Sequence, residues 1–245
     1  MYGLAAVLAS LVGLSLGLLG GGGSILTVTI LVYALHLDEK EAIATSLVVV
    51  AVTSAVAMVQ HVRAGNVDWR VGATFGAAGM AGALVGGWIA SWFSGQVLMV
   101  LFALMMVATA LGMLRGRDAG AVPHRAAGWV IAAQGLSVGF ATGLVGAGGG
   151  FLVVPALVLL GGLPMNKAIG TSLLVICLNS IAGVAGHLSH ATIDLGLAGT
   201  FSAVAAVGAV LGSMASTRID QAVLRRGFAV FVLVLGVVQL VNELV

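Results

Sequence analysis

Residues 17–47 read GLLGGGGSILTVTILVYALHLDEKEAIATSL, and residues 143–173 read GLVGAGGGFLVVPALVLLGGLPMNKAIGTSL. The two stretches align without a gap at an offset of 126 residues, and about 30 of the 98 positions from 17 to 114 are identical in this register. The register also pairs Ser54 with Ser180, His61 with His187, Asp68 with Asp194 and Gly86 with Gly212. A doubled apolar chain with a glycine break at matching points in both halves is typical of a membrane transporter.

The composition is that of a membrane protein. Hydrophobic residues make up 60% of the 245 residues and charged residues only 7%, whereas soluble domains carry about 25% charged residues. We therefore expect an all-α polytopic membrane protein. Its apolar segments fall at about 2–19, 24–37, 42–60, 71–93, 96–114, 127–145, 150–163, 168–187, 195–216 and 222–243.

The segments that follow the glycine breaks are unusually short. Segments 24–37 and 150–163 have 14 residues each, which as helices would be roughly 21 Å long. The hydrocarbon core of a bilayer is about 30 Å thick. These segments are therefore either short tilted crossings or re-entrant halves that turn back inside the membrane.

The ten basic residues indicate how the halves are oriented. If each half crossed an even number of times, five basic residues would lie on each side of the membrane. If each half crossed an odd number of times, eight would face the cytoplasm and only Lys40 and Lys167 would face out. The positive-inside rule favours the second arrangement. Loop 61–70 is also basic, while its partner 187–196 has no Lys or Arg.

We therefore expect two inverted structural repeats with both termini outside. Each repeat would consist of a glycine-broken or re-entrant helix pair followed by three membrane helices. Residues 1–245 would form a single transmembrane transporter domain, with repeat one over about 1–114, a linker at 115–126 and repeat two over about 127–245.

The glycine runs Gly20–Gly23 and Gly146–Gly150 suggest an anion site. Each is followed by a new helical segment, whose first amides have no intrahelical partner and carry partial positive charge. Two such ends facing one another near the membrane midplane would hold an anion without a buried lysine or arginine. No charged residue lies in the middle of any apolar segment, which disfavours a cation site.

Polar side chains accompany the breaks. In the first half, Ser46, Thr53 and His61 recur at a spacing that places them near one helix face. In the second half, Ser172, Asn179 and His187 do the same. The candidate substrate-binding residues are Gly20, Gly21, Gly22, Gly23, Ser24, Thr45, Ser46, Gly146, Gly148, Gly149, Gly150, Phe151, Thr171, Ser172 and Asn179. His61 and His187 are candidate gating or proton-sensitive groups.

Simpler interpretations stand beside these. Glycines can serve only close helix packing, and serines and threonines can bond the carbonyl four residues earlier in their own helix. The two histidines can be capping or interfacial residues, and Asp68 and Asp194 can cap helices. His187 and His190 have a metal-like spacing, but no further ligand completes a site, so we expect no metal. The glycine runs do not fit a nucleotide-binding loop.

The two break motifs resemble those of the TauE/SafE family of bacterial membrane permeases. They are G-L-L-G-G-G-G-S-I-L-T-V from residue 17 and G-L-V-G-A-G-G-G-F-L-V-V-P from residue 143, each followed by A-I-(A/G)-T-S-L. The first copy has Thr29 where the second has Pro155, a position that the family often fills with proline. The resemblance implies a multi-pass protein of the bacterial cell inner membrane that exports sulfite or an organosulfonate such as sulfoacetate.

We therefore expect a secondary transporter that exports a small anion by alternating access, with no cofactor and no enzymatic activity. An anion channel or a permease for another small anion remains an alternative. A membrane enzyme would need a nucleophile with a base, or a metal cluster, and a subunit that only scaffolds a partner would leave the breaks unexplained. The expected partners are a small anionic substrate and the lipid bilayer, without nucleic acid, and assembly into a homo-oligomer is left open.

Overall fold

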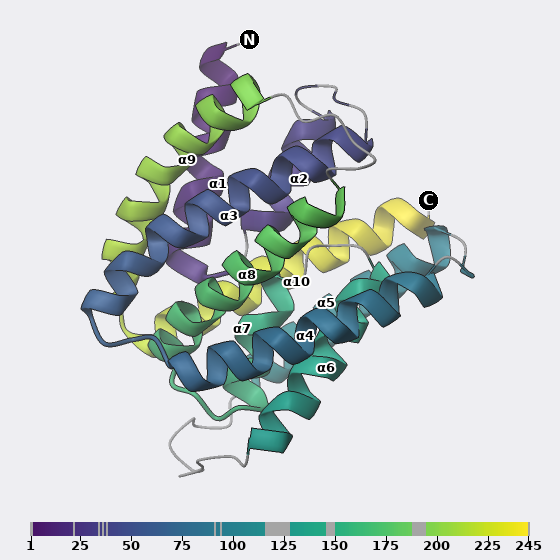
Figure 1. Cartoon of the computed structure of the whole chain (residues 1–245), viewed down its shortest axis with the longest axis vertical. Helices are drawn as coiled ribbons and strands as arrows, with labels where there is room; N and C mark the ends of the chain where they lie inside the picture. The colour runs from purple at the N-terminus through teal and green to yellow at the C-terminus, as the bar shows by residue number, and fades with distance from the viewer. Residues whose placement is uncertain are drawn as a thin grey trace.

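The computed structural model is all-helical in the residues that it describes, which are 2–21, 23–33, 35, 37, 39–90, 92–93, 95–115, 128–145, 150–187 and 195–244. Ten helices and no strand occupy these ranges (Figure 1). They are α1 (Tyr2–Leu19), α2 (Gly23–Tyr33), α3 (Glu39–Arg63), α4 (Trp69–Ala90), α5 (Gly95–Leu114), α6 (Gly128–Val145), α7 (Gly150–Leu159), α8 (Met165–His187), α9 (Leu195–Ser216) and α10 (Gln221–Leu244). Each apolar segment expected from the sequence coincides with one helix, which confirms the all-α class.

Four of the described helices contain stretches that are long and apolar enough to cross a membrane. These stretches are Ala44–Arg63 in α3, Met165–Val184 in α8, Leu195–Ser216 in α9 and Gln221–Val241 in α10. They carry at most two charged residues in their most apolar 18-residue window. A bilayer-spanning helix needs about 20 such residues.

The helices after the two breaks are too short to cross a bilayer alone. α2 has 11 residues and α7 has 10, which corresponds to roughly 15–17 Å of helix. α7 is buried along its length from Gly150 to Val158. It therefore lies inside the bundle, where its first amides are held away from lipid.

α1 and α9 pack closely and run in the same direction. A Cβ atom added at Gly13 of α1 would overlap the carbonyl of Ala205, and one added at Gly17 would overlap the carbonyl of Ala209, one helical turn further along α9. From the other side, Gly208 lies against the carbonyl of Ser10. Backbones that approach this closely require glycine at the contact.

α4 and α6 pack through the repeat-equivalent contact, in which α6 takes the place of α1 and α4 takes the place of α9. A Cβ atom at Gly139 of α6 would overlap the carbonyl of Gly79, and one at Gly82 of α4 would overlap the carbonyl of Leu136. Adding or subtracting the offset of 126 converts the Gly13–Ala205 contact into Gly139–Gly79, and Gly208–Ser10 into Gly82–Leu136. The internal repeat of the sequence is therefore also a repeat of its helix contacts.

The equivalent helices α3 and α8 cross in opposite directions. Gly183, near the end of α8, faces the side chain of Leu47 near the start of α3. Gly170, near the start of α8, faces His61 and the backbone of Asn66 at the end of α3. α3 and α8 are therefore antiparallel, whereas α1 with α9 and α4 with α6 are parallel.

Most of the described basic residues gather at one end of the bundle, which we call the basic end. It lies at the lower left of Figure 1, where α3 and α9 end and where α4, α8 and α10 begin. The basic residues at these helix ends are Arg63, Arg70, Lys167, Arg218, Arg225 and Arg226.

The expectation that Lys167 faces the side opposite to Arg63 is wrong. Lys167 lies in the first turn of α8, and Gly170, in the next turn, packs against Asn66 just beyond α3. Both basic residues therefore lie at the same end. The placement of Lys167 makes the charge asymmetry between the two ends larger than the sequence argument assumed.

The close packing of α4 on α6 predicts opposite effects for two Gly→Ala substitutions. Gly139→Ala should lower the free energy of unfolding by about 1–3 kcal/mol, because the new Cβ overlaps the backbone of Gly79. Gly199→Ala in α9 has no atom within 4 Å of its new Cβ, so it should be neutral or gain up to about 1 kcal/mol of helix propensity. Thermal unfolding in detergent measures both, and equal stability of the two variants would contradict the packing.

Candidate functional site

The first glycine break meets the start of the second short helix. α1 ends at Leu19, and Gly20 takes a left-handed conformation (φ 71°) whose amide donates to the Leu16 carbonyl at 2.8 Å, as in a common helix C-cap. Gly21 is buried, and its Cα lies against the backbone of Gly150 and Phe151 at the start of α7. The structure thus brings together four of the candidate site residues from the two halves.

Ser172 links the first break to α8. Its buried hydroxyl lies 2.8 Å from the carbonyl oxygen of Gly20 and 2.7 Å from that of Ile169, so its single proton is shared between the two acceptors. A carbonyl freed at a helix end inside an apolar bundle needs such a donor. Ser172 therefore has a structural partner on the backbone of the break.

Thr171 also has a partner within the protein. Its hydroxyl oxygen accepts a hydrogen bond of 3.0 Å from the backbone amide of Asp68. The carboxylate of Asp68 in turn accepts from the amide of Val71 at 3.0 Å, which confirms Asp68 as the N-cap of α4. Thr171 thus fastens α8 to the loop before α4.

Thr45, the repeat equivalent of Thr171, has no such partner. Its hydroxyl oxygen is fully buried and makes no hydrogen bond within the described part of the chain. The same is true of the Ser54 hydroxyl and of the side-chain oxygen of Asn179. Ser46 is also buried but is not one of these unpartnered groups. Buried polar atoms without a partner are uncommon and point to a water or a ligand that satisfies them.

Two other hydroxyls bond a carbonyl of their own helix, which is the simpler interpretation of serine and threonine in apolar helices. Thr53 donates to the carbonyl of Val49 at 2.7 Å, and Thr27 donates to that of Gly23 at 2.6 Å. Both bonds run four residues back along the same helix, as side chains in apolar helices commonly do.

His61 is buried at a junction of helices from both halves. Its side chain is 1% exposed, and Nε2 lies 3.2 Å from the hydroxyl of Ser216 at the end of α9. The backbone of Gly17 in α1 approaches the same ring. The imidazole therefore connects α3 with α9 instead of lying at a surface.

Some candidate residues lie outside the part of the chain that the structure describes. These are Gly22, Gly146, Gly148 and Gly149, together with the side chains of Ser24 and His187. Gly23 is buried at the start of α2, and Ser24 follows it within that helix. Among the residues that the structure does describe, no group of three or more His, Cys, Asp or Glu side chains could hold a metal ion.

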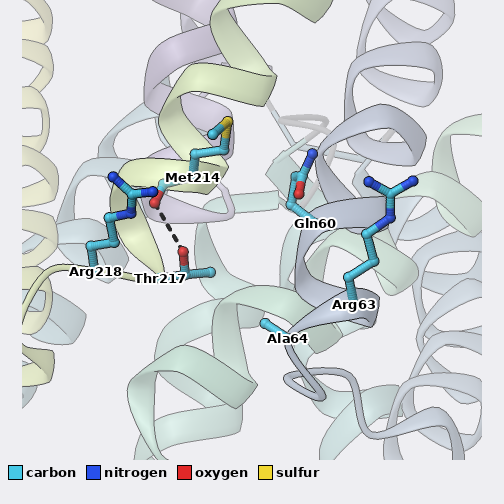
Figure 2. Close-up of a pocket in the computed structure, with 6 residues that line it drawn as sticks. All are labelled: Gln60, Arg63, Ala64, Met214, Thr217 and Arg218. Atoms are coloured by element: carbon cyan, nitrogen blue, oxygen red, sulfur yellow. Dashed lines mark hydrogen bonds between the residues drawn. The ribbon is translucent and has the colours of Figure 1, made fainter.

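A pocket of about 290 Å³ opens between the ends of α3 and α9. Figure 2 shows its lining, with the α3 residues on one wall and the α9 residues on the other. The lining residues are Gln60, Arg63, Ala64, Met214, Thr217 and Arg218. Sequence reasoning used the two arginines only to orient the chain, because nothing in the sequence indicates that α3 and α9 end side by side.

An apolar helical bundle in which a glycine break meets the start of a short buried helix is typical of helical membrane transporters. Residues 5–238 match the family described as "Sulfite exporter TauE/SafE". The chain belongs to this family. No solved structure matches it.

Several relatives carry the same general description. A "Probable membrane transporter protein" of Xylella fastidiosa (strain 9a5c) is 35% identical over 237 residues, which cover 93% of this chain and 90% of the relative. The "Probable membrane transporter protein YunE" of Bacillus subtilis (strain 168) is 27% identical over 208 residues, covering 74% of this chain and 76% of the relative. A "Probable membrane transporter protein" of Haemophilus influenzae is 24% identical over 254 residues, covering 96% of each chain.

The different surroundings of the two equivalent threonines give a testable contrast. Thr171→Val should lower the free energy of unfolding by about 1 kcal/mol, because the Asp68 amide loses its acceptor. Thr45→Val removes a buried hydroxyl without a partner and should leave stability unchanged or raised. Thermal unfolding of both variants in the same detergent checks this, and a larger loss in Thr45→Val than in Thr171→Val would contradict the assignment.

Proposed function

We propose that this protein is a secondary transporter that exports a small anion, sulfite or an organosulfonate such as sulfoacetate, across the bacterial inner membrane. The observation that carries the proposal is the contact between Gly21 at the first break and Gly150 at the start of α7. The first break meets the start of a short helix there, and neither residue of the contact has a side chain, which suits an anion held by amides and hydroxyls. The description of the family supports the choice of a sulfur oxyanion.

The two halves are proposed to be inverted repeats. The equivalent helices α3 and α8 run antiparallel. This is the arrangement of two repeats that are related by a pseudo-twofold axis perpendicular to the helices. A pseudo-twofold axis parallel to the helices would leave the equivalent helices parallel. Gathering of the basic residues at one end agrees with the positive-inside rule if that end is cytoplasmic.

Substrate contacts would come from backbone amides and from the polar atoms left without a partner. The first amides of α2 and α7, from Gly23 and Gly150, point partial positive charge away from each helix. The Thr45 hydroxyl can donate a hydrogen bond that the described residues do not use. The unpartnered atom of Asn179 is Oδ1, an acceptor, so Asn179 would contact an anion only through its Nδ2 donors. Ser172 and Thr171 would shape the site through their bonds to Gly20 and Asp68.

Alternating access would require the halves to move relative to one another. His61 belongs to the first half and Ser216 to the second, and their 3.2 Å contact joins α3 to α9 near the basic end. Opening this contact would separate the two helix ends that flank the pocket in Figure 2. His61 is therefore proposed as a gating residue on that side.

Transport by reconstituted protein tests the proposed function. Efflux of labelled sulfoacetate or sulfite from proteoliposomes should saturate and should be accelerated by the same anion on the far side. Thr45→Val should reduce this flux by about tenfold or more, the effect of losing one hydrogen bond to a charged ligand, while stability is retained. Thr200→Val, the same change at an exposed position in α9, is the control. Flux that never saturates would indicate an anion channel, and no anion flux at all would refute the proposal.

Labelling of repeat-equivalent loops tests the inverted arrangement. In a Cys177→Ala background, Gly65→Cys should be protected from a membrane-impermeant maleimide in intact cells, because its loop is basic. Ala191→Cys, at the equivalent position 126 residues later, should react. Labelling of both positions from the same side would mean that the halves are parallel.

A further inference from the structure

We propose that the pocket between the ends of α3 and α9 binds an oxyanion, such as a sulfonate, sulfite or phosphate group, through Arg63 and Arg218. The inference rests on the proposed function and adds to it that this pocket is the vestibule where an anion arrives from the basic end. It adds a second anion site, distinct from the glycine breaks. The pocket volume of about 290 Å³ is large enough for such a group.

The lining of the pocket has the chemistry that an oxyanion needs. Arg63 comes from the last turn of α3 and Arg218 follows the end of α9, so one guanidinium stands on each wall (Figure 2). Gln60 lies between them and offers a side-chain amide as a further donor. Arginine is well suited to oxyanions because its planar group donates two parallel hydrogen bonds.

The acidic residues nearest to the two arginines in the sequence bond backbone amides at the starts of helices. Asp68 caps α4 by accepting from the amide of Val71, and Asp220 accepts from the amide of Ala222 at 2.8 Å as α10 begins. Within the described ranges, no carboxylate forms an ion pair with Arg63 or Arg218. The two positive charges are therefore available to a ligand.

The pocket lies close to the His61–Ser216 contact. His61 and Ser216 are the sequence neighbours of the lining residues Gln60 and Thr217. Gly17 of α1 also approaches the His61 ring, and Gly20 lies one turn further along the chain. An anion in the pocket would therefore lie near the contact that joins α3 to α9.

The basic lining of this pocket is not repeated at the equivalent positions of the two halves. The positions equivalent to its six lining residues are Gly186, Ser189, His190, Trp88, Ser91 and Trp92. In place of Arg218 stands Trp92, which packs edge-on against Trp88 with ring centroids 5.0 Å apart. No arginine or lysine occurs in the equivalent set. Electrostatic capture of anions would thus operate at one end of the transporter only, as expected for entry from the cytoplasm.

Transport kinetics test the vestibule. Arg63→Gln and Arg218→Gln should each raise the KM for sulfoacetate efflux about threefold to tenfold with an unchanged maximal rate, since one of the two exposed charges that line the pocket is lost. The KM of the wild type should rise with ionic strength more steeply than that of the variants. Arg226→Gln, an exposed arginine of α10 at the same end but outside the pocket, is the matched control and should behave as wild type.

A second measurement separates the substrate from lipid. Thermal stabilisation of detergent-solubilised protein is recorded with sulfate, phosphate, short-chain phosphatidylglycerol and short-chain phosphatidylcholine. A raised KM together with weaker stabilisation by sulfate supports the vestibule. Loss of the phosphatidylglycerol effect alone, with KM unchanged, would identify a lipid phosphate as the occupant and overturn the vestibule role.

If Arg63→Gln and Arg218→Gln match Arg226→Gln in every assay, the oxyanion site is refuted. This outcome is independent of the proposed function, because sulfate and phosphate report on the pocket even if the wild type transports no anion. Conversely, saturable anion efflux that is insensitive to both arginines would retain the transporter and refute only the pocket.

Discussion

The structure depends on the need of backbone groups at helix breaks for partners inside an apolar bundle. Each unsatisfied group costs several kcal/mol where no water is present. The first break meets this need through Ser172, whose hydroxyl bonds the Gly20 carbonyl at 2.8 Å, and through the approach of Gly21 to Gly150. The ends of α1, α7 and α8 are positioned by these contacts.

The fold class and the helices followed from the sequence because apolar length and glycine breaks are local properties. The pairing of helices did not follow, because it depends on contacts such as Gly139 on Gly79 that no local pattern specifies. Lys167 was misplaced for this reason: only the packing of Gly170 on Asn66 shows at which end α8 begins.

The structure separates the members of the candidate site by their partners. Thr45 and Thr171 occupy equivalent positions in the sequence, yet only Thr171 reaches a backbone amide, that of Asp68. That difference arises from the surroundings of each helix and could not be read from the motif A-I-(A/G)-T-S-L. The pocket with Arg63 and Arg218 was missed because it joins residues 155 positions apart.

The central claim is that an anion binds where the first glycine break meets the start of α7, and ligand-induced stabilisation tests it most directly. A ligand that binds only the folded state must raise its stability, so unfolding temperatures would be measured with sulfite, sulfoacetate, sulfate, chloride and choline. The account predicts that sulfite or sulfoacetate stabilises the wild type. The stabilisation should persist in Gly227→Ala, where the new Cβ meets nothing within 4 Å. It should be lost in Gly21→Ala, where the new Cβ overlaps the Gly150 carbonyl. Stabilisation by choline with no response to any anion, or an anion response that persists in Gly21→Ala, would contradict it.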